Sequence, residues 1–373
     1  MRVFFKKKVC RALFHGRRSS DGNLLGGDRL RRGATKALRR RALYKTHQQP
    51  VTIDRMFSYR HAFHAGNHAD VLKHTVLLAI LRHLLLKEAA LTVFDSHAGA
   101  GLYRLDSDYA ATSGEAGNGF LRLISALDTA VAPVQKSRAD TKSVATSKLT
   151  IDALAPALKD YVDMVASFNS KDNHKVYPGS PFIIQRLLRE RDKLKLFEIH
   201  PTDAKTLAAN IAQLEAGRQV AVLREDGFEG LKKFLPPPAR RALVLCDPSY
   251  EIKTDYARVV AMVADALIRF ATGTYAIWYP IIPRPEAHDL PRKLKTLASK
   301  AGRPWLNASL TVKSSKLRAD ETGAVIRPGL PASGMFVINP PHSLKAALQL
   351  ALPQMVTLLT QDKNAASSLE LGA

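Results

Sequence analysis

Short apolar stretches alternate with longer amphipathic segments along most of the chain. Apolar runs of strand length occur at residues 91–101, 194–200, 219–227, 242–250, 274–280, 309–314 and 334–341. Between them, helical signals predict helices at about 68–87, with Asn67 as N-cap, at 255–271 and 286–301, and from about residues 180, 202 and 344. This alternation predicts an α/β fold with a parallel, doubly wound sheet. The last two strands lie close together, which predicts an antiparallel hairpin at one edge.

The first 55 residues lack this pattern. Their arginines are clustered and no apolar period is sustained, as in the stretch RLRRGATKALRRRALYK. We expect residues 1–55 to be a basic, disordered extension. Three interpretations stay open: an RNA-binding arm, a transit peptide, or a misplaced start upstream of a native start at Met56.

Charge changes the picture because the basic excess is not confined to that extension. The 373 residues carry a net charge of +23, and residues 1–55 hold 16 basic and three acidic residues. The remainder therefore still carries +10, which predicts a polyanionic partner.

Cysteine content and hydropathy exclude several classes of protein. The two cysteines, Cys10 and Cys246, cannot build a disulfide framework or a cysteine-rich zinc site, and they fit a reducing, cytoplasmic compartment. The most apolar run, residues 75–86, is interrupted by Arg82 and His83 and is too short to span a membrane.

Acids and glycines follow four consecutive predicted strands. They are Asp95, His97, Gly99 and Gly101 after the first, Glu198 and His200 after the second, Asp226 and Gly227 after the third, and Asp247 to Tyr250 after the fourth. Ligands of such sheets bind beyond the carboxyl ends of the strands. Four acids there exceed what solvation requires, so we expect a ligand site at this edge.

The glycine turn HAGAGLYR suits a ligand that has no phosphate. The chain contains no GxxxxGK[ST] loop, and Arg104 stands where a dinucleotide fingerprint has its third glycine. S-adenosylmethionine is such a ligand. It needs glycines for close backbone approach, an acid after the second strand for its ribose, and a polar contact for its adenine near the end of the third. Glu198 and Asp226 are the candidates for those two contacts.

The stretch CDPSY (246–250) is a candidate for methyl transfer to the exocyclic amine of adenine. That amine is a poor nucleophile until both its hydrogens are held by hydrogen-bond acceptors. The Asp247 carboxylate and the Pro248 carbonyl are the candidates for these two acceptors. Tyr250 is the expected stacking partner of a flipped base, and the methyl group then moves by in-line displacement. The alternative is a plain strand-ending turn. Ser249 stands where a second proline is usual.

Two further motifs are weaker candidates. NPPH (339–342) has both prolines, but we expect Asn339 to leave the last strand at the far edge of the sheet, and His342 is a small stacking platform. His64 and His68 are four residues apart, as zinc ligands can be, but no Cys or Glu completes a pattern, so we expect no metal.

Seven motifs in matching order resemble the bacterial 23S ribosomal RNA adenine-N6-methyltransferases of the RlmJ type. They are SYRHAFHAGNHADVLKH (58–74), DSHAGAGLY (95–103), YPGSP (177–181), FEIHP (197–201), EDGF (225–228), DPSYE (247–251) and ASGMFVINPP (332–341). The resemblance runs from about Met56 to the C-terminus. Ser249 departs from the family pattern, and residues 134–148 resemble an insertion.

The resemblance implies a Rossmann-like class I S-adenosylmethionine-dependent methyltransferase. Its domain would comprise residues 56–101 and 179–373, with a small helical subdomain inserted at 102–178. The implied reaction is N6-methylation of adenine 2030 in largely protein-free 23S rRNA by a cytoplasmic monomer.

The resemblance also assigns site residues. Asp247, Pro248 and Tyr250 are the implied catalytic set. Lys73, His74, His97, Ser180, Glu198, Asp226 and Gly227, with Gly99 and Gly101 of the glycine turn, are the implied donor-binding residues, and Tyr59, His61 and Lys73 are the implied RNA contacts. Two alternatives stay open: a non-catalytic RNA-binding protein on this fold, which would not bind the donor, and a DNA adenine-N6 methyltransferase, which would label duplex DNA.

Overall fold

The computed structural model describes residues 64–106, 115–128, 149–170, 174–316, 318–319, 325–326 and 329–373. These residues belong to the unit Met56–Ala373. The predictions for residues 1–55, Met56, Tyr59, His61 and the loop 134–148 lie outside the described residues.

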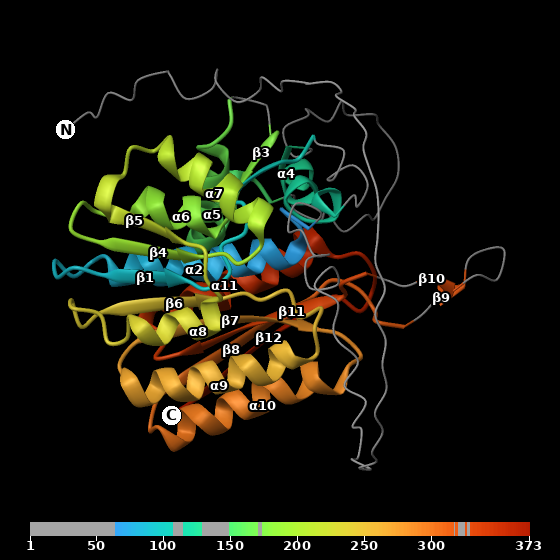
Figure 1. The fold of residues 1–373 in the computed structure, drawn as a ribbon. Coiled ribbons are helices and arrows are strands. Elements are labelled where there is room, and N and C mark those ends of the chain that lie inside the picture. Colours follow the sequence, from blue (N-terminus) through green and yellow to red (C-terminus); the bar gives the residue numbers. More distant parts are fainter. Residues whose placement is uncertain are drawn as a thin grey trace, which may run out of the picture. The chain divides into compact units, whose positions relative to one another are not determined.

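An eight-stranded sheet of order β12-β8-β11-β7-β6-β1-β4-β5 organises the described part (Figure 1). Five strands run parallel, as the alternation predicted: β1 (Thr92–Asp95), β4 (Lys193–Phe197), β5 (Val220–Leu223), β6 (Ala242–Cys246) and β7 (Thr274–Ile281). Three are antiparallel: β8 (Trp305–Thr311), β11 (Ala332–Ile338) and β12 (Ala366–Gly372). The fold is therefore mixed α/β with a mostly parallel sheet.

The predicted edge hairpin is only partly correct. β8 and β11 do pair in antiparallel fashion, but β11 lies between β7 and β8 and pairs with both. The edge is formed by β12, whose mostly exposed side chains give no apolar pattern to recognise. Because β11 runs against its neighbours, its last residues lie at the amino ends of the parallel strands.

Helices cover both faces of the sheet and bury two separate apolar clusters. One cluster includes side chains of α2 (His68–Leu84), α4 (Phe120–Asp128), α5 (Pro156–Ala166), α6 (Ser180–Leu187), α7 (Pro201–Ala212) and α11 (His342–Leu359). The other includes those of α8 (Gly227–Gly230), α9 (Thr254–Arg269) and α10 (Pro285–Lys300). Consecutive strand residues such as Val93 and Phe94 belong to opposite clusters, as the period of two requires.

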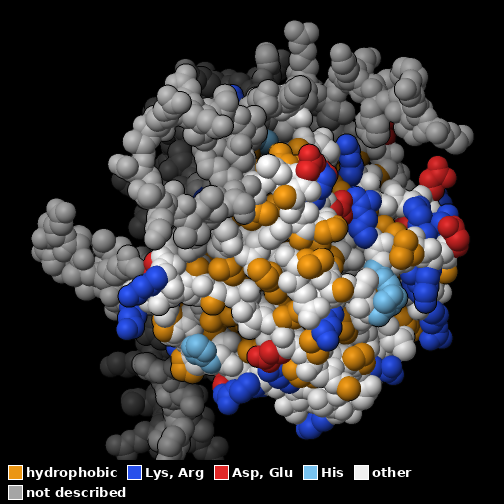
Figure 2. Space-filling model, turned by 180° about the vertical axis from the view of Figure 1, so that it is seen from behind, with side chains coloured by type: hydrophobic (Ala, Val, Ile, Leu, Met, Phe, Trp, Pro, Cys, Tyr) orange, Lys and Arg blue, Asp and Glu red, His pale blue; other side chains and the backbone are white. Residues whose placement is uncertain are grey.

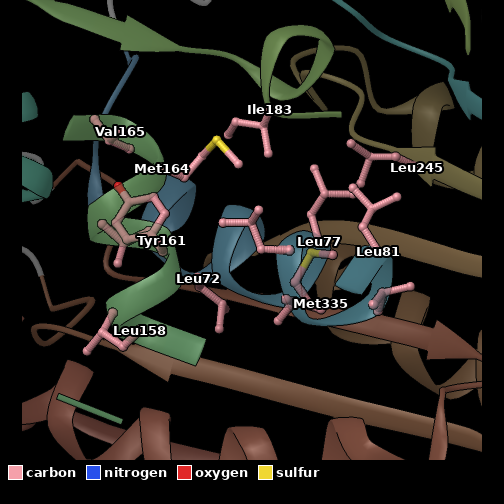
Figure 3. Packing of buried hydrophobic residues seen from close by; sticks show 14 of the residues in the cluster. Leu72, Leu77, Leu81, Leu158, Tyr161, Met164, Val165, Ile183, Leu245 and Met335 are labelled. Atoms are coloured by element: carbon pink, nitrogen blue, oxygen red, sulfur yellow. The ribbon is translucent and has the colours of Figure 1, made fainter. Parts of the chain in front are cut away.

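Helix α2 is buried on nearly all sides. Figure 3 shows Leu72, Leu77 and Leu81 of α2 packed among side chains of α5, α6, β6 and β11. This position explains why its sequence has no polar face, and each fully buried leucine stabilises the fold by about 1.5–3 kcal/mol. The predicted N-cap is confirmed, since the side chain of Asn67 accepts a hydrogen bond from the Asp70 amide at 3.0 Å. The core therefore fixes the polar first turns of α2.

The segment 102–178 contains helices and a small antiparallel pair among its described residues. β2 (Leu102–Arg104) pairs with β3 (Val176–Pro178), while α4 and α5 share the core cluster of α2 and α11. A second short pair, β9 (Arg318–Ala319) with β10 (Val325–Ile326), lies between β8 and β11 in the sequence. We retain the inserted helical subdomain as a proposal.

Gly227 begins α8 directly against the end of β1, and this close approach is testable. A Cβ at this position would lie 1.9 Å from the carbonyl oxygen of Ser96. Because that neighbour is backbone, we expect Gly227→Ala to lower the free energy of unfolding by about 1–3 kcal/mol in denaturant titrations. Gly117→Ala is the control, since its Cβ would meet nothing within 4 Å. Equal unfolding free energies for the two variants would contradict the close approach.

Candidate active site

Two adjoining cavities open at the carboxyl ends of the parallel strands. The β4 cavity is lined by residues of α2, the glycine turn, the start of α6 and the end of β4, among them Lys73, His74, His97, Gly99, Ser180 and Glu198. The β7 cavity is lined by residues around the start of α2 and the end of β7, among them Asn67, Asp70, Tyr250, Trp278, Pro280 and Arg284. Three residues, Lys73, Asp247 and Ser249, line both cavities. The cavities therefore meet at the turn after β6.

Lys73 links this turn to helix α2. Its Nζ lies 2.7 Å from Oδ1 of Asp70 and forms a second ion pair with Oδ2 of Asp247. Burial by itself would lower the pKa of Lys73, but Asp247 and Asp70 outweigh it and raise the pKa. The buried ammonium therefore stays charged and holds the Asp247 carboxylate at the cavity junction.

Asp95 holds Ser180, one of the residues that line the β4 cavity. It is fully buried at the end of β1 and accepts a hydrogen bond from the Ser180 hydroxyl at 2.7 Å. Burial raises its pKa to about 6, and the nearby charge of Asp247 acts in the same direction. Asp95 thus joins the end of β1 to the start of α6.

Glu198 closes the other side of the β4 cavity. Its carboxylate accepts hydrogen bonds from the backbone amides of Gly99 and His200, both at 2.7 Å. Burial raises its pKa to about 7 despite these two bonds, which act in the opposite direction. Gly99 has a φ of +59°, a left-handed conformation that glycine adopts without strain. The glycine turn and the end of β4 are therefore held together by a carboxylate that faces the cavity.

An aromatic wall lies behind the β7 cavity. Tyr250 is 2% exposed, and its ring centroid lies 4.6 Å from that of Tyr256 and 5.9 Å from that of Trp278. Its hydroxyl donates to the Trp278 carbonyl at 2.7 Å, and its own carbonyl accepts from Nη1 of Arg284 at 3.0 Å. These contacts fix Tyr250 in a left-handed conformation with a φ of +54°.

Most of the predicted site residues line one of the two cavities. The β4 cavity is lined by Lys73, His74, His97, Gly99, Ser180, Glu198 and Asp247, and the β7 cavity by Tyr250 together with Lys73 and Asp247. Gly101, Asp226, Gly227 and Pro248 line neither cavity. Asp226 caps α8 by accepting from the Phe228 amide at 3.0 Å, and it forms an ion pair with Arg258.

Several residues of the site were not predicted. Asp70 lies one helical turn before Lys73, a spacing that the sequence does show and that predicts an ion pair. Trp278 and Arg284 come from the end of β7 and the start of α10, where no local motif marks them.

The motif NPPH lies away from the cavities, as predicted, but not because it is at the far edge of the sheet. Asn339 follows the antiparallel strand β11, so it lies at the opposite ends of the parallel strands from Asp247. Its Nδ2 donates to the carbonyls of Ala271 at 2.8 Å and Gly273 at 2.6 Å, which ties the loop before β7. The far edge of the sheet is not involved.

The two histidines at the start of α2 lie in different surroundings, His64 beside a carboxylate and His68 buried. Nδ1 of His64 lies 2.8 Å from Oε2 of Glu115, and burial lowers the pKa of His68 to about 4. Among the residues that the structure describes, no cluster of three or more His, Cys, Asp or Glu side chains is arranged to hold a metal ion. No helix in the described ranges is long and apolar enough to cross a membrane.

Comparison with known proteins places this chain in a family. The model of the family described as ribosomal RNA large subunit methyltransferase D, RlmJ, matches residues 142–370. The chain is 39% identical over 298 residues to ribosomal RNA large subunit methyltransferase J of Escherichia coli, covering 80% of this chain and 92% of that protein. It is 37% identical over 316 residues to the Haemophilus influenzae protein of the same name, covering 84% and 98%.

A solved structure is similar over most of the chain. Protein LPL1258 from Legionella pneumophila has a TM-score of 0.65 and 27% sequence identity, and the match covers 83% of this chain and 98% of that one. The sheet order, the junction at Asp247 and these matches agree with the Rossmann-like fold that the sequence predicted. The chain belongs to the RlmJ family of ribosomal RNA large subunit methyltransferases.

Proposed function

We propose that this protein transfers the methyl group of S-adenosylmethionine to N6 of one adenine in 23S rRNA, the adenine at position 2030. The observation that carries the proposal is the shared Asp247. A methyl donor and a base must approach one another in line, and two cavities that meet at one carboxylate provide that arrangement.

The β4 cavity suits the donor, which supplies an electrophilic methyl group on a sulfonium. Glu198 is placed to accept hydrogen bonds from ribose hydroxyls, and Gly99 leaves room for backbone approach. Lys73, His74, His97 and Ser180 complete the proposed donor contacts. A contact of Asp226 with the donor adenine requires its carboxylate to exchange Arg258 for the ligand. Gly227 and Gly101 line neither cavity and act through packing: Gly227 lets α8 approach the backbone of Ser96, and Gly101 leaves room for the side chains of Phe182 and Leu207.

The β7 cavity suits a flipped adenine. The proposed stacking surface consists of Trp278, which is half-buried, and Tyr250, which lines the cavity although only 2% of it is exposed; stacking is worth roughly 1–3 kcal/mol per base. Asp247 and the Pro248 carbonyl accept the two amine hydrogens and so direct the nitrogen lone pair at the methyl group. Because Pro248 lines neither cavity, its role requires the turn to present this carbonyl to the bound base. The ammonium of Lys73 binds Oδ2 of Asp247, so Oδ1 is the oxygen that we assign to the amine. The proton that the methylated amine loses passes to Asp247.

The partner is an RNA chain bound largely through charge. Lysine and arginine side chains are spread over the face seen in Figure 2, with no single patch on the described surface there. Together with Lys73, Tyr59 and His61 stay proposed RNA contacts, although both lie outside the described residues. The proposal includes action as a monomer in the cytoplasm on RNA that is largely free of ribosomal proteins.

The role of Asp247 is tested by comparing the two proline motifs. We expect Asp247→Ala to slow transfer of label from S-adenosylmethionine to unmodified 23S rRNA by about 100-fold or more, because an acceptor for the amine is lost. Asn339→Gly keeps the left-handed backbone but loses two hydrogen bonds, so it should lower stability while the transfer rate is retained. Full activity of Asp247→Ala would contradict the assignment, and label in duplex DNA instead of RNA would contradict the substrate.

Donor binding should depend on pH through Glu198. Its pKa of about 7 means that the unliganded site holds a proton below neutrality, whereas ribose hydroxyls are accepted best by the ionised form. The affinity measured by calorimetry should therefore rise about tenfold between pH 6 and pH 8. Glu198→Gln keeps an acceptor oxygen but cannot ionise, so its affinity should change much less. An equal pH dependence in the two proteins would rule out Glu198 as the titrating group.

A further inference from the structure

Ser249 occupies the place of the second motif proline, yet the turn around it is held without a proline ring. The next residue, Tyr250, is fixed at three points: its carbonyl by Arg284, its hydroxyl by the carbonyl of Trp278, and its ring by Tyr256. Pro248 already restricts the backbone before the serine. The conformation of the turn therefore does not depend on residue 249 being proline.

Ser249 lies at the junction of the two cavities. The residue is half-buried and, like Asp247 and Lys73, lines the β4 and the β7 cavity. Its hydroxyl makes no hydrogen bond to another residue of the described ranges, whereas the carboxylate of Asp247 is held by Lys73. Residue 249 thus brings a hydrogen-bond donor that proline lacks to the junction of the two cavities.

We propose that the Ser249 hydroxyl donates a hydrogen bond to a ring nitrogen of the target adenine beside its amine, which makes Ser249 a specificity-determining residue. This inference rests on the proposed function. Adenine carries the acceptors N1 and N7 on either side of the carbon that bears the amine. With the amine held by Asp247 and Pro248, the following residue is placed to reach one of these neighbouring atoms.

The chemistry of the two reactants favours the base over the donor as partner. The part of S-adenosylmethionine that must approach the amine is a sulfonium cation, which does not accept a hydrogen bond. In the proposed binding mode, the ribose of the donor is bound by Glu198, which lines the β4 cavity. Adenine instead presents an acceptor next to the atom that reacts, and guanine presents a carbonyl oxygen in place of the amine. A serine hydroxyl here therefore adds recognition of the substrate and not of the donor.

Steady-state kinetics of three variants test the proposal on an RNA fragment that contains the adenine labelled by the wild type. Ser249→Ala and Ser249→Pro should lower kcat/KM for RNA by about three- to tenfold, the loss of one neutral hydrogen bond, with KM for S-adenosylmethionine unchanged. Ser249→Thr retains the hydroxyl and should stay close to the wild type. Donor binding by calorimetry shows that each variant is folded. Wild-type rates for Ser249→Ala, or a faster Ser249→Pro, would overturn the proposal.

Replacing single atoms of the base identifies the acceptor. The fragment is made with 1-deazaadenosine or with 7-deazaadenosine at the labelled position. One of the two analogues should lower the rate of the wild type by about the same factor as Ser249→Ala does. The same analogue should not lower the rate of Ser249→Ala further, because that variant already lacks the hydrogen bond. If, for both analogues, the effect of the analogue and the effect of Ser249→Ala on the rate multiply, the proposal is overturned. Absence of any RNA label with the wild type refutes the proposed function itself, whereas equal rates of wild type and Ser249→Ala refute only the role of Ser249.

Discussion

The ion pairs of Lys73 with Asp70 and Asp247 are the interactions on which the rest of the site depends. All three groups are largely withdrawn from solvent, so removing one partner leaves a charge buried and costs about 3–5 kcal/mol. Lys73 is placed by α2, which the core surrounds and Asn67 caps, while Asp247 is placed by the end of β6. Packing of the core thus sets the geometry at the point where the two cavities meet.

Strand direction decides which of two similar motifs can take part. CDPSY and NPPH both follow strands of the same sheet, and NPPH is spelled closer to the expected tetrapeptide. β6 is parallel to its neighbours and delivers Asp247 to the cavities, whereas β11 is antiparallel and delivers Asn339 to the other end, where it ties the loop before β7. The residue pattern of a motif alone therefore does not identify the site.

Much of the fold and part of the site could be predicted, because the signals were local. The parallel strands are short apolar runs, and residues such as Glu198 and Asp247 directly follow them. The placement of β11 and β12 depends on pairing with distant strands, and the polar edge strand β12 carries no apolar alternation. Trp278 and Arg284 reach the β7 cavity only through the packing of β7 and α10 against the turn at Tyr250. For Asp226, the sequence indicates its position after the third strand, but it does not show that the carboxylate forms an ion pair with Arg258.

The central claim is that Asp247 directs an exocyclic adenine amine at the methyl group across the cavity junction. It is tested most directly by incubating unmodified 23S rRNA with labelled S-adenosylmethionine and the wild-type protein, digesting the RNA, and identifying the labelled nucleoside and its position by mass spectrometry. The account predicts N6-methyladenosine at a single position. Label on a ring nitrogen, on a ribose or on another base would contradict it.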